Sequence, residues 1–106
     1  MSQSADVDVA VIGAGTAGLA AYRAAVAAGK RAVVIEAGPH GTTCARVGCM
    51  PSKLLIAAAE AAHAVGRAAG FGVHIDGAVR IDGRAVMERV RSERNRFVDF
   101  VLRDVE

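Results

Sequence analysis

The sequence lacks the features that mark several common classes of protein. No run reaches the 18 or more uncharged apolar residues that a membrane span requires, and the first residues lack the basic region of a signal peptide. Two cysteines are too few for the disulfide framework of a small secreted scaffold. Thirteen basic and eleven acidic residues are too balanced to indicate a nucleic-acid binder. We therefore expect a cytoplasmic protein with no membrane or nucleic-acid partner, in which a close pair of cysteines has a chemical role.

Large apolar side chains are also scarce for a chain of 106 residues. Apolar residues make up 53% of the sequence, but 23 of them are alanine. Burying an alanine methyl contributes about 0.8 kcal/mol, against roughly 1.5–3 kcal/mol for a valine, leucine or phenylalanine side chain. The sequence therefore predicts one domain at most, with a thin core.

A β-α-β unit is predicted in the first 36 residues. The apolar runs 6–12 and 31–35 are typical of buried parallel strands. The alanine-rich stretch 19–28 between them has high helix propensity and ends at Gly29. The crossover between the two strands should be right-handed.

Two further helices are predicted after an irregular stretch that follows Glu36. The first covers 51–69, and Asp82 is the expected N-cap of the second, which runs to about residue 104. Residues 71–81 could hold short strands around a turn. The whole pattern is α/β, with only two convincing parallel strands, which are too few for a doubly wound sheet covered on both faces.

The glycines between the first strand and the first helix have the spacing G-x-G-x-x-G. Gly13 would permit the tight turn, Gly15 would let a pyrophosphate approach the backbone, and Gly18 would let helix and strand pack closely. Glu36 closes the next strand, where it would accept hydrogen bonds from ribose hydroxyls. The pyrophosphate would meet the positive end of the helix dipole. The alternative is that the glycines only pack the turn, and the motif by itself does not separate FAD from NAD.

Cys44 and Cys49 stand five positions apart in the stretch G-T-T-C-A-R-V-G-C-M-P-S-K (41–53). Within one regular helix their Cα atoms would lie roughly 8.7 Å apart, beyond the limit of about 7 Å for a disulfide. We therefore expect Cys44 on an irregular turn, with flexibility supplied by Gly48. Pro51 fits the first turn of a helix, which puts Cys49 at a helix N-terminus, where the dipole favours a thiolate. The pair is predicted to be reducible and unequal, with one thiol accessible and the other held electrostatically.

Other interpretations of this stretch are weaker. A zinc site needs four ligands, and three histidines at unhelpful spacings do not complete it: His40, His63 and His74. We therefore predict no metal. A thioredoxin-type motif would be C-x-x-C, while two inert buried cysteines remain an alternative. Lys53 lies near the expected N-terminus of the helix, where the dipole does not stabilise a positive charge. This position indicates an anionic or electron-rich partner for Lys53, and the alternative is that its side chain is simply solvated.

The runs V-I-G-A-G-T-A-G (11–18) and 41–53, together with Glu36, resemble the N-terminal part of the pyridine nucleotide–disulfide oxidoreductases. The resemblance covers essentially the whole chain. Pro-Ser-Lys (51–53) is more similar to the lipoamide and mercuric reductase branches than to glutathione reductases, and dihydrolipoamide dehydrogenase is the best fit.

This resemblance implies that the dinucleotide is FAD and that Cys44 and Cys49 are the catalytic pair. Cys49 matches the thiol that lies against the flavin, Cys44 the interchange thiol that attacks the substrate disulfide, and Lys53 the lysine beside the flavin. Electrons would pass from dihydrolipoamide to the cysteines, then to FAD and to NAD. The residues expected to bind FAD are Gly13, Gly15, Thr16, Ala17, Gly18, Glu36, Ala37, Thr42, Thr43, Gly48 and Lys53.

Two positions depart from the family pattern. Thr42 stands where the family usually has a glycine, and Arg46 replaces a common asparagine. Family members are also several times longer, and no second G-x-G-x-x-G is present here. We therefore expect residues 1–106 to be an N-terminal fragment of an incomplete Rossmann-like FAD-binding domain, without the NAD-binding and dimer-interface domains.

Expectations for the isolated chain follow from this resemblance. Such a fragment should have no turnover, weak FAD retention and a tendency to self-associate, whereas the full-length form should be a homodimer that acts on a dithiol such as dihydrolipoamide. The alternatives are a mercuric or other disulfide reductase and a standalone nucleotide-binding or redox-sensing module.

Overall fold

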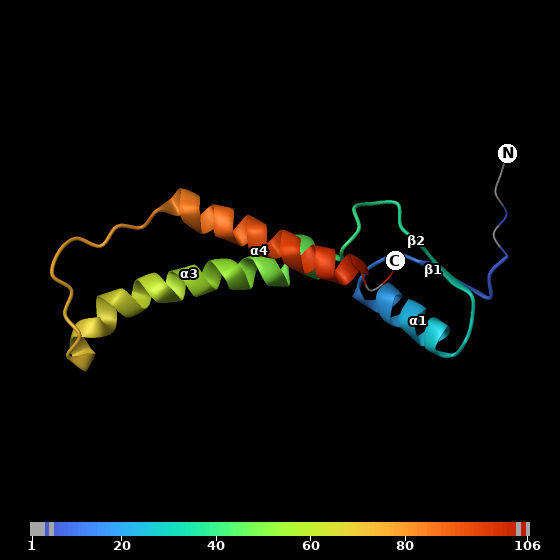
Figure 1. The fold of residues 1–106 in the computed structure, drawn as a ribbon, viewed down its shortest axis with the longest axis horizontal. Coiled ribbons are helices and arrows are strands. Elements are labelled where there is room, and N and C mark those ends of the chain that lie inside the picture. Colours follow the sequence, from blue (N-terminus) through green and yellow to red (C-terminus); the bar gives the residue numbers. More distant parts are fainter. Residues whose placement is uncertain (1–3, 5, 104, 106) are drawn as a thin grey trace.

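The protein is an elongated α/β molecule in the computed structural model, which describes residues 4, 6–103 and 105. A small parallel sheet with one helix lies at one end, and two long helices extend away from it (Figure 1). The radius of gyration is 21.0 Å and the extents are 68 × 29 × 16 Å. A compact domain of this length has a radius of gyration near 13 Å, so much of the chain lies far from any common core.

The β-α-β unit predicted from the sequence is present. Strand β1 (Val9–Ile12) pairs in parallel with β2 (Ala32–Ile35), and helix α1 (Thr16–Ala27) connects them. Both strands are shorter than predicted, and the helix begins three residues earlier. The register pairs Val9 with Ala32 and Ile12 with Ile35, so the two strands end together beside the glycine turn.

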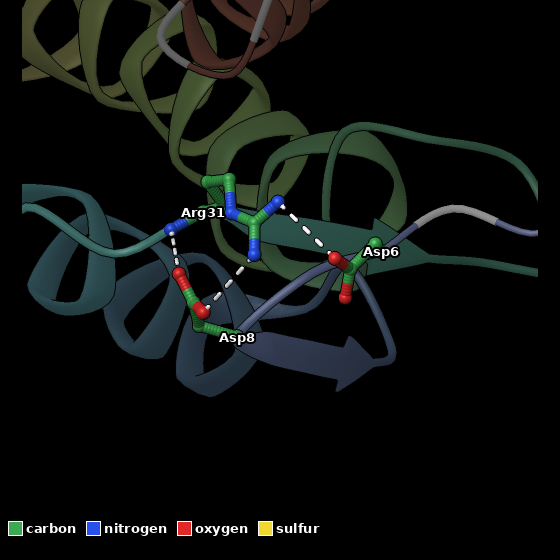
Figure 2. Close-up of polar contacts among 3 residues, drawn as sticks. All are labelled: Asp6, Asp8 and Arg31. Atoms are coloured by element: carbon green, nitrogen blue, oxygen red, sulfur yellow. Dashed lines mark hydrogen bonds and ion pairs between the residues drawn. The ribbon is translucent and has the colours of Figure 1, made fainter.

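Polar contacts join the opposite ends of these strands, where each strand begins (Figure 2). The backbone N–H of Arg31 donates to Asp8 Oδ2 at 2.8 Å, and the backbone N–H of Asp8 donates to the Arg31 carbonyl at 2.8 Å. The guanidinium of Arg31 also lies 3.4 Å from Asp8 Oδ1 and 3.6 Å from Asp6 Oδ2. The Arg31 N–H, and then its guanidinium, lower the pKa of Asp8. These contacts hold the register from the end of the sheet remote from the glycines.

The second half of the chain is helical. Helix α2 (Thr43–Val47) is followed after one residue by α3 (Cys49–Arg67), then by a 3₁₀ turn (Ala68–Phe71) and by α4 (Gly83–Arg103). Helices α3 and α4 lie side by side and run in opposite directions (Figure 1). The predicted N-cap of the last helix is confirmed, because the Ala85 N–H donates to Asp82 Oδ1 at 3.1 Å. Residue 104, where that helix was expected to end, lies outside the described residues.

The prediction of short strands within 71–81 is wrong. Residues 72–82, all of them described, form an open connection between α3 and α4 with no strand. The stretch repeats V-x-I-D-G at 73–77 and 79–83, and the alternation of apolar and polar residues is what favours a strand in the sequence. A strand also needs a neighbour for its backbone groups, and the connection passes beyond the reach of β1 and β2.

The core is as thin as the alanine content predicts. The buried apolar residues are Val11, Ala14, Leu19, Ala45 and Val90. Large side chains such as Ile12 and Phe71 stay 86% and 79% exposed. None of the helices in the described part of the chain is long and apolar enough to cross a membrane.

Candidate redox and dinucleotide site

The glycine turn between β1 and α1 has the geometry expected of its first and third glycines. Gly13 has a φ of +100°, which a side chain would disfavour. A Cβ on Gly18 would overlap the carbonyl oxygen of Gly13, so helix and strand approach each other more closely than an alanine would permit. Gly15 caps the helix, and a Cβ there would meet nothing within 4 Å. Open space therefore lies over Gly15, next to the first helical turn of Thr16 and Ala17, whose N–H groups have no partner within the helix.

Glu36 links the ends of the two strands. Its Oε2 accepts from the Ala14 N–H and its Oε1 from the Gly38 N–H, both at 2.8 Å. These two hydrogen bonds, that of Ala14 first, lower the pKa of Glu36 below its ordinary value. Each carboxylate oxygen keeps acceptor capacity for a further donor, so the predicted ribose contact remains open to Glu36 and stays a prediction. Ala37, next to it, is exposed.

The two cysteines lie on consecutive helices rather than on a turn and a helix. Cys44 is the second residue of α2, which corrects the predicted irregular turn, and Cys49 is the first residue of α3. Gly48, where the sequence predicts flexibility, separates the two helices with a φ of −119° and a ψ of −108°. A Cβ on Gly48 would lie 3.4 Å from the Cα of Cys44. The break therefore folds the start of α3 back against α2.

This break brings the two sulfurs together as free thiols. The Cys49 thiol hydrogen-bonds the Cys44 thiol, and this contact, followed by partial burial, raises the pKa of Cys44. The Cys49 backbone N–H and the charge of Lys53 act in the opposite direction. The arrangement suits formation of a disulfide between the two residues.

The two thiols differ in their exposure in the structure. Cys44 is half-buried and Cys49 is exposed, because α2 packs against both α3 and α4 with Ala45 buried between them. Lys53 lies exposed on the second turn of α3, where its charge acts on Cys44. The first turn of α3 also holds Ser52, whose Oγ donates to the Cys49 carbonyl at 2.9 Å.

Thr42 caps α2 from a strained conformation. Its Oγ1 accepts from the Ala45 N–H at 3.0 Å, and its φ of 60° with ψ of 149° is a region that almost only glycine adopts. It is the one residue other than glycine with positive φ among the described residues. Thr43 follows as the first residue of the helix. Threonine at position 42 therefore provides a side-chain cap for α2, whereas the glycine that the family pattern predicts there would adopt this backbone conformation without strain.

Replacing Thr42 by glycine should raise the free energy of unfolding by about 1 kcal/mol or more. Strain of this kind costs about 1–3 kcal/mol, whereas a threonine cap loses only a few tenths of a kcal/mol when glycine replaces it. Thr42→Ala should have the opposite effect, because it removes the cap, worth about 1 kcal/mol, and keeps the strain. Urea unfolding of the two variants and the parent measures both changes in the free energy of unfolding. A Thr42→Gly variant that unfolds at lower urea than the parent would show that Thr42 is not strained.

A cavity of about 550 Å³ lies beside the glycine turn and was not predicted. Its lining comes from α1, β2, the connection after β2 and the end of α4: Ala14, Leu19, Tyr22, Ala32, Val33, Val34, His40, Gly41, Leu102 and Val105. The helical spacing of Leu102 and Val105 in the sequence signals an apolar face, but not what that face meets. The structure thus brings Ala14 of the glycine turn and Gly41 of the cysteine stretch to one cavity.

Comparison with known proteins identifies the class of protein. The family model described as pyridine nucleotide-disulphide oxidoreductase matches residues 7–105. The chain belongs to this family, as its motifs predicted.

Curated relatives of this chain include both mercuric reductases and dihydrolipoyl dehydrogenases. A mercuric reductase of Streptomyces lividans is 48% identical over 64 residues, which cover 60% of this chain and 14% of that protein. Dihydrolipoyl dehydrogenases of Chlamydia muridarum and Halobacterium salinarum are 43% and 42% identical, over 77% and 69% of this chain and 17% and 15% of their own lengths. The chain therefore spans less than a fifth of these curated relatives.

Proposed function

We propose that this chain is the N-terminal part of an FAD-dependent disulfide oxidoreductase, in which Cys44 and Cys49 pass electrons between a dithiol substrate and FAD. The helix break at Gly48, which sets the start of α3 against Cys44 and brings the two cysteines together, is the observation that carries this proposal. Dihydrolipoamide is the substrate we propose first, and mercuric ion is the second candidate because relatives of both kinds are similar to this chain.

The residues around the glycine turn fit an adenine dinucleotide. The open space over Gly15 faces the N-terminus of the twelve-residue helix α1, where free N–H groups and the helix dipole favour a pyrophosphate. Glu36 is fixed at the adjacent strand end by two backbone amides. We propose that these residues, with Thr42, Thr43 and Lys53, hold FAD, which when bound supplies a two-electron acceptor for the cysteine pair.

The thiol chemistry is an exchange in two steps. A substrate thiolate attacks Sγ of Cys44 in the Cys44–Cys49 disulfide, so the bond between the cysteines breaks and Cys49 leaves as a thiolate. The second substrate thiolate then attacks the substrate sulfur of the mixed disulfide and expels Cys44. The substrate becomes a disulfide, the cysteines gain two electrons, and the two substrate protons are released. The N-terminus of α3 stabilises the charge that develops on Cys49.

The proposal also says what covers the exposed side chain of Cys49 and where the other domains of the whole enzyme come from. Cys49 is exposed in this chain, and we propose that FAD covers it. Residues 1–106 would be the first part of a Rossmann-like FAD-binding domain, while NAD binding and the interface of a homodimer would be provided by residues outside this range. On this account the chain alone binds FAD weakly and does not turn over dihydrolipoamide.

The substitution Gly15→Ser should weaken FAD binding without lowering the stability of the fold. Serine is a good N-cap and meets no atom at this position, so the urea midpoint should stay equal or rise. Its side chain would fill the space proposed for the pyrophosphate, so FAD affinity should fall by about tenfold or more. Equilibrium dialysis against FAD, for this variant and the parent, measures the change. Equal FAD binding by the two proteins would contradict the proposed dinucleotide site.

A further inference from the structure

A hollow lined by two aromatic side chains and by charged residues lies between α4 and the start of α3. Its volume is about 540 Å³, and its lining residues are Met50, Leu54, Glu93, Arg96, Phe97, Asp99, Phe100 and Arg103. The rings of Phe97 and Phe100 lie with their centroids 6.4 Å apart, and the two residues are 38% and 63% exposed. Exposed aromatic side chains surrounded by arginines are typical of a surface that another protein covers.

The residues that α4 contributes to this hollow form a stripe along the helix. Positions 93, 96, 97, 100 and 103 recur at intervals of three or four residues, so they share one face of α4. Glu93 stands at the N-terminal end of this stripe and Arg103 at its C-terminal end, about 15 Å further along the helix. The two phenylalanines lie between them. The stripe thus has an acid at one end, a base at the other and an apolar middle.

The charges at both ends of the stripe can accept a further partner. Arg103 is exposed and forms no ion pair within the described part of the chain. Glu93 uses its Oε2 for Arg96 at 2.8 Å, which leaves Oε1 for another donor. A guanidinium and a carboxylate pair well because two parallel hydrogen bonds can join them. A partner helix with the same charges in the reverse order would therefore fit the stripe.

A second copy of α4, running in the opposite direction, has this reverse order. Two identical surfaces pair about a two-fold axis, which makes every contact occur twice. With the axis at the level of Val98, Glu93 lies opposite Arg103 of the second copy, and Phe97 lies opposite Phe100 of the second copy. Two copies in the same direction would instead place like charges against each other. The stripe is therefore complementary to itself in the antiparallel arrangement only.

We propose that two copies of this chain associate through the stripe of α4 in this antiparallel arrangement. The contact places the exposed phenylalanines of both copies in one apolar centre, with an ion pair between Glu93 and Arg103 at each end. The inference does not rest on the cysteines or on FAD. It adds a contact within residues 1–106 to the homodimer interface that the proposed function places outside them.

Reversal of the charges at the two ends of the stripe tests the proposed arrangement. Sedimentation equilibrium of the whole chain, with its thiols kept reduced, measures the dissociation constant of the dimer. Arg103→Glu and Glu93→Arg should each raise this constant about tenfold or more, because each places like charges at both ends of the contact. The double variant restores two opposite pairs and should return the constant to within about threefold of the parent. Circular dichroism of each variant measures the helix content.

Arg91→Glu is the matched control, since it makes the same change of charge at an exposed position of α4 that does not line the hollow. It should leave the dissociation constant unchanged. A double variant that associates no more tightly than the single variants would overturn the proposal, as would an equal loss in Arg91→Glu. A parent chain that stays monomeric up to about 1 mM would also overturn it.

A second pair of variants tests the apolar middle of the stripe. Phe100→Ala should raise the dissociation constant about tenfold or more, because each dimer loses two aromatic side chains from the centre of the contact. Phe71→Ala makes the same change at a residue that is 79% exposed on the 3₁₀ turn, and it should have no effect. Equal effects of the two substitutions would overturn the proposal, since any exposed aromatic side chain would then promote association.

Discussion

Cys49→Ser converts the product of thiol exchange from an internal disulfide to a stable mixed disulfide. The parent chain, reduced and then treated with dithiobis(nitrobenzoate), should release two coloured thiolates and retain no aromatic group. The variant should release one thiolate and keep one aromatic group on Cys44. The reason is that the second thiol, which contacts the Cys44 thiol across the break at Gly48, is the group that resolves the mixed disulfide. Absorbance and intact-protein mass together measure both quantities.

A second variant completes this experiment. Cys44→Ser should also retain one aromatic group, on Cys49, and should react faster than Cys49→Ser because Cys49 is exposed whereas Cys44 is half-buried. A parent chain that retains two aromatic groups would contradict the contact between the sulfurs, since each thiol would then react independently.

Gly18→Ala should lower the free energy of unfolding by about 3 kcal/mol or more, at the upper end of the range for overpacked sites. The added Cβ overlaps the carbonyl oxygen of Gly13 and would also lie 3.4 Å from a methyl carbon of Val11. Relief requires α1 to move away from β1, which exposes Leu19, one of the few buried side chains. Urea unfolding followed by circular dichroism measures the loss.

Gly66→Ala is the matched control for this substitution. Gly66 lies within α3, and a Cβ there meets nothing within 4 Å. Alanine should therefore stabilise the helix by about 0.5–1 kcal/mol. If Gly18→Ala and Gly66→Ala shifted the urea midpoint in the same direction, the close approach of α1 to β1 would not determine the stability of the β-α-β unit.

Local signals in the sequence were sufficient to predict the β-α-β unit and the N-cap at Asp82. The spacing of the glycines reflects what the backbone requires, since Gly13 has a positive φ and Gly18 closely approaches the backbone of Gly13. Both requirements concern residues close in the chain or in one supersecondary unit, which is where pattern and propensity are informative.

The geometry of the cysteines was only partly predictable. The distance argument correctly required a break between Cys44 and Cys49, but a five-residue helix is too short to leave a periodic pattern. Its cap at Thr42 depends on a backbone conformation that sequence statistics disfavour for threonine. Burial of Cys44 depends on α4, which begins almost forty residues later, so no local rule predicts which thiol is the more exposed.

The features that the sequence did not predict depend on contacts between residues far apart in the chain. The cavity beside the glycine turn joins residues from separate elements, and the sequence does not indicate that Ala14 and Gly41 line the same space. The repeated V-x-I-D-G stretch predicted strands because alternation was the only signal, while the missing partner strand is a property of the whole fold. The elongated shape has the same origin, because alanine-rich helices bury too little area to draw the chain into one core.

The disulfide state of the parent chain in glutathione buffers tests the central claim most directly. The chain is equilibrated at several ratios of reduced to oxidised glutathione, trapped with acid and weighed by mass spectrometry. The contact between the thiols predicts a single transition from the dithiol to a chain lighter by two hydrogens, with Cys44 linked to Cys49 in the peptide map and little glutathione bound at any ratio. Independent glutathione adducts on Cys44 and Cys49, without the internal bond, would contradict the assignment of these residues as a redox pair.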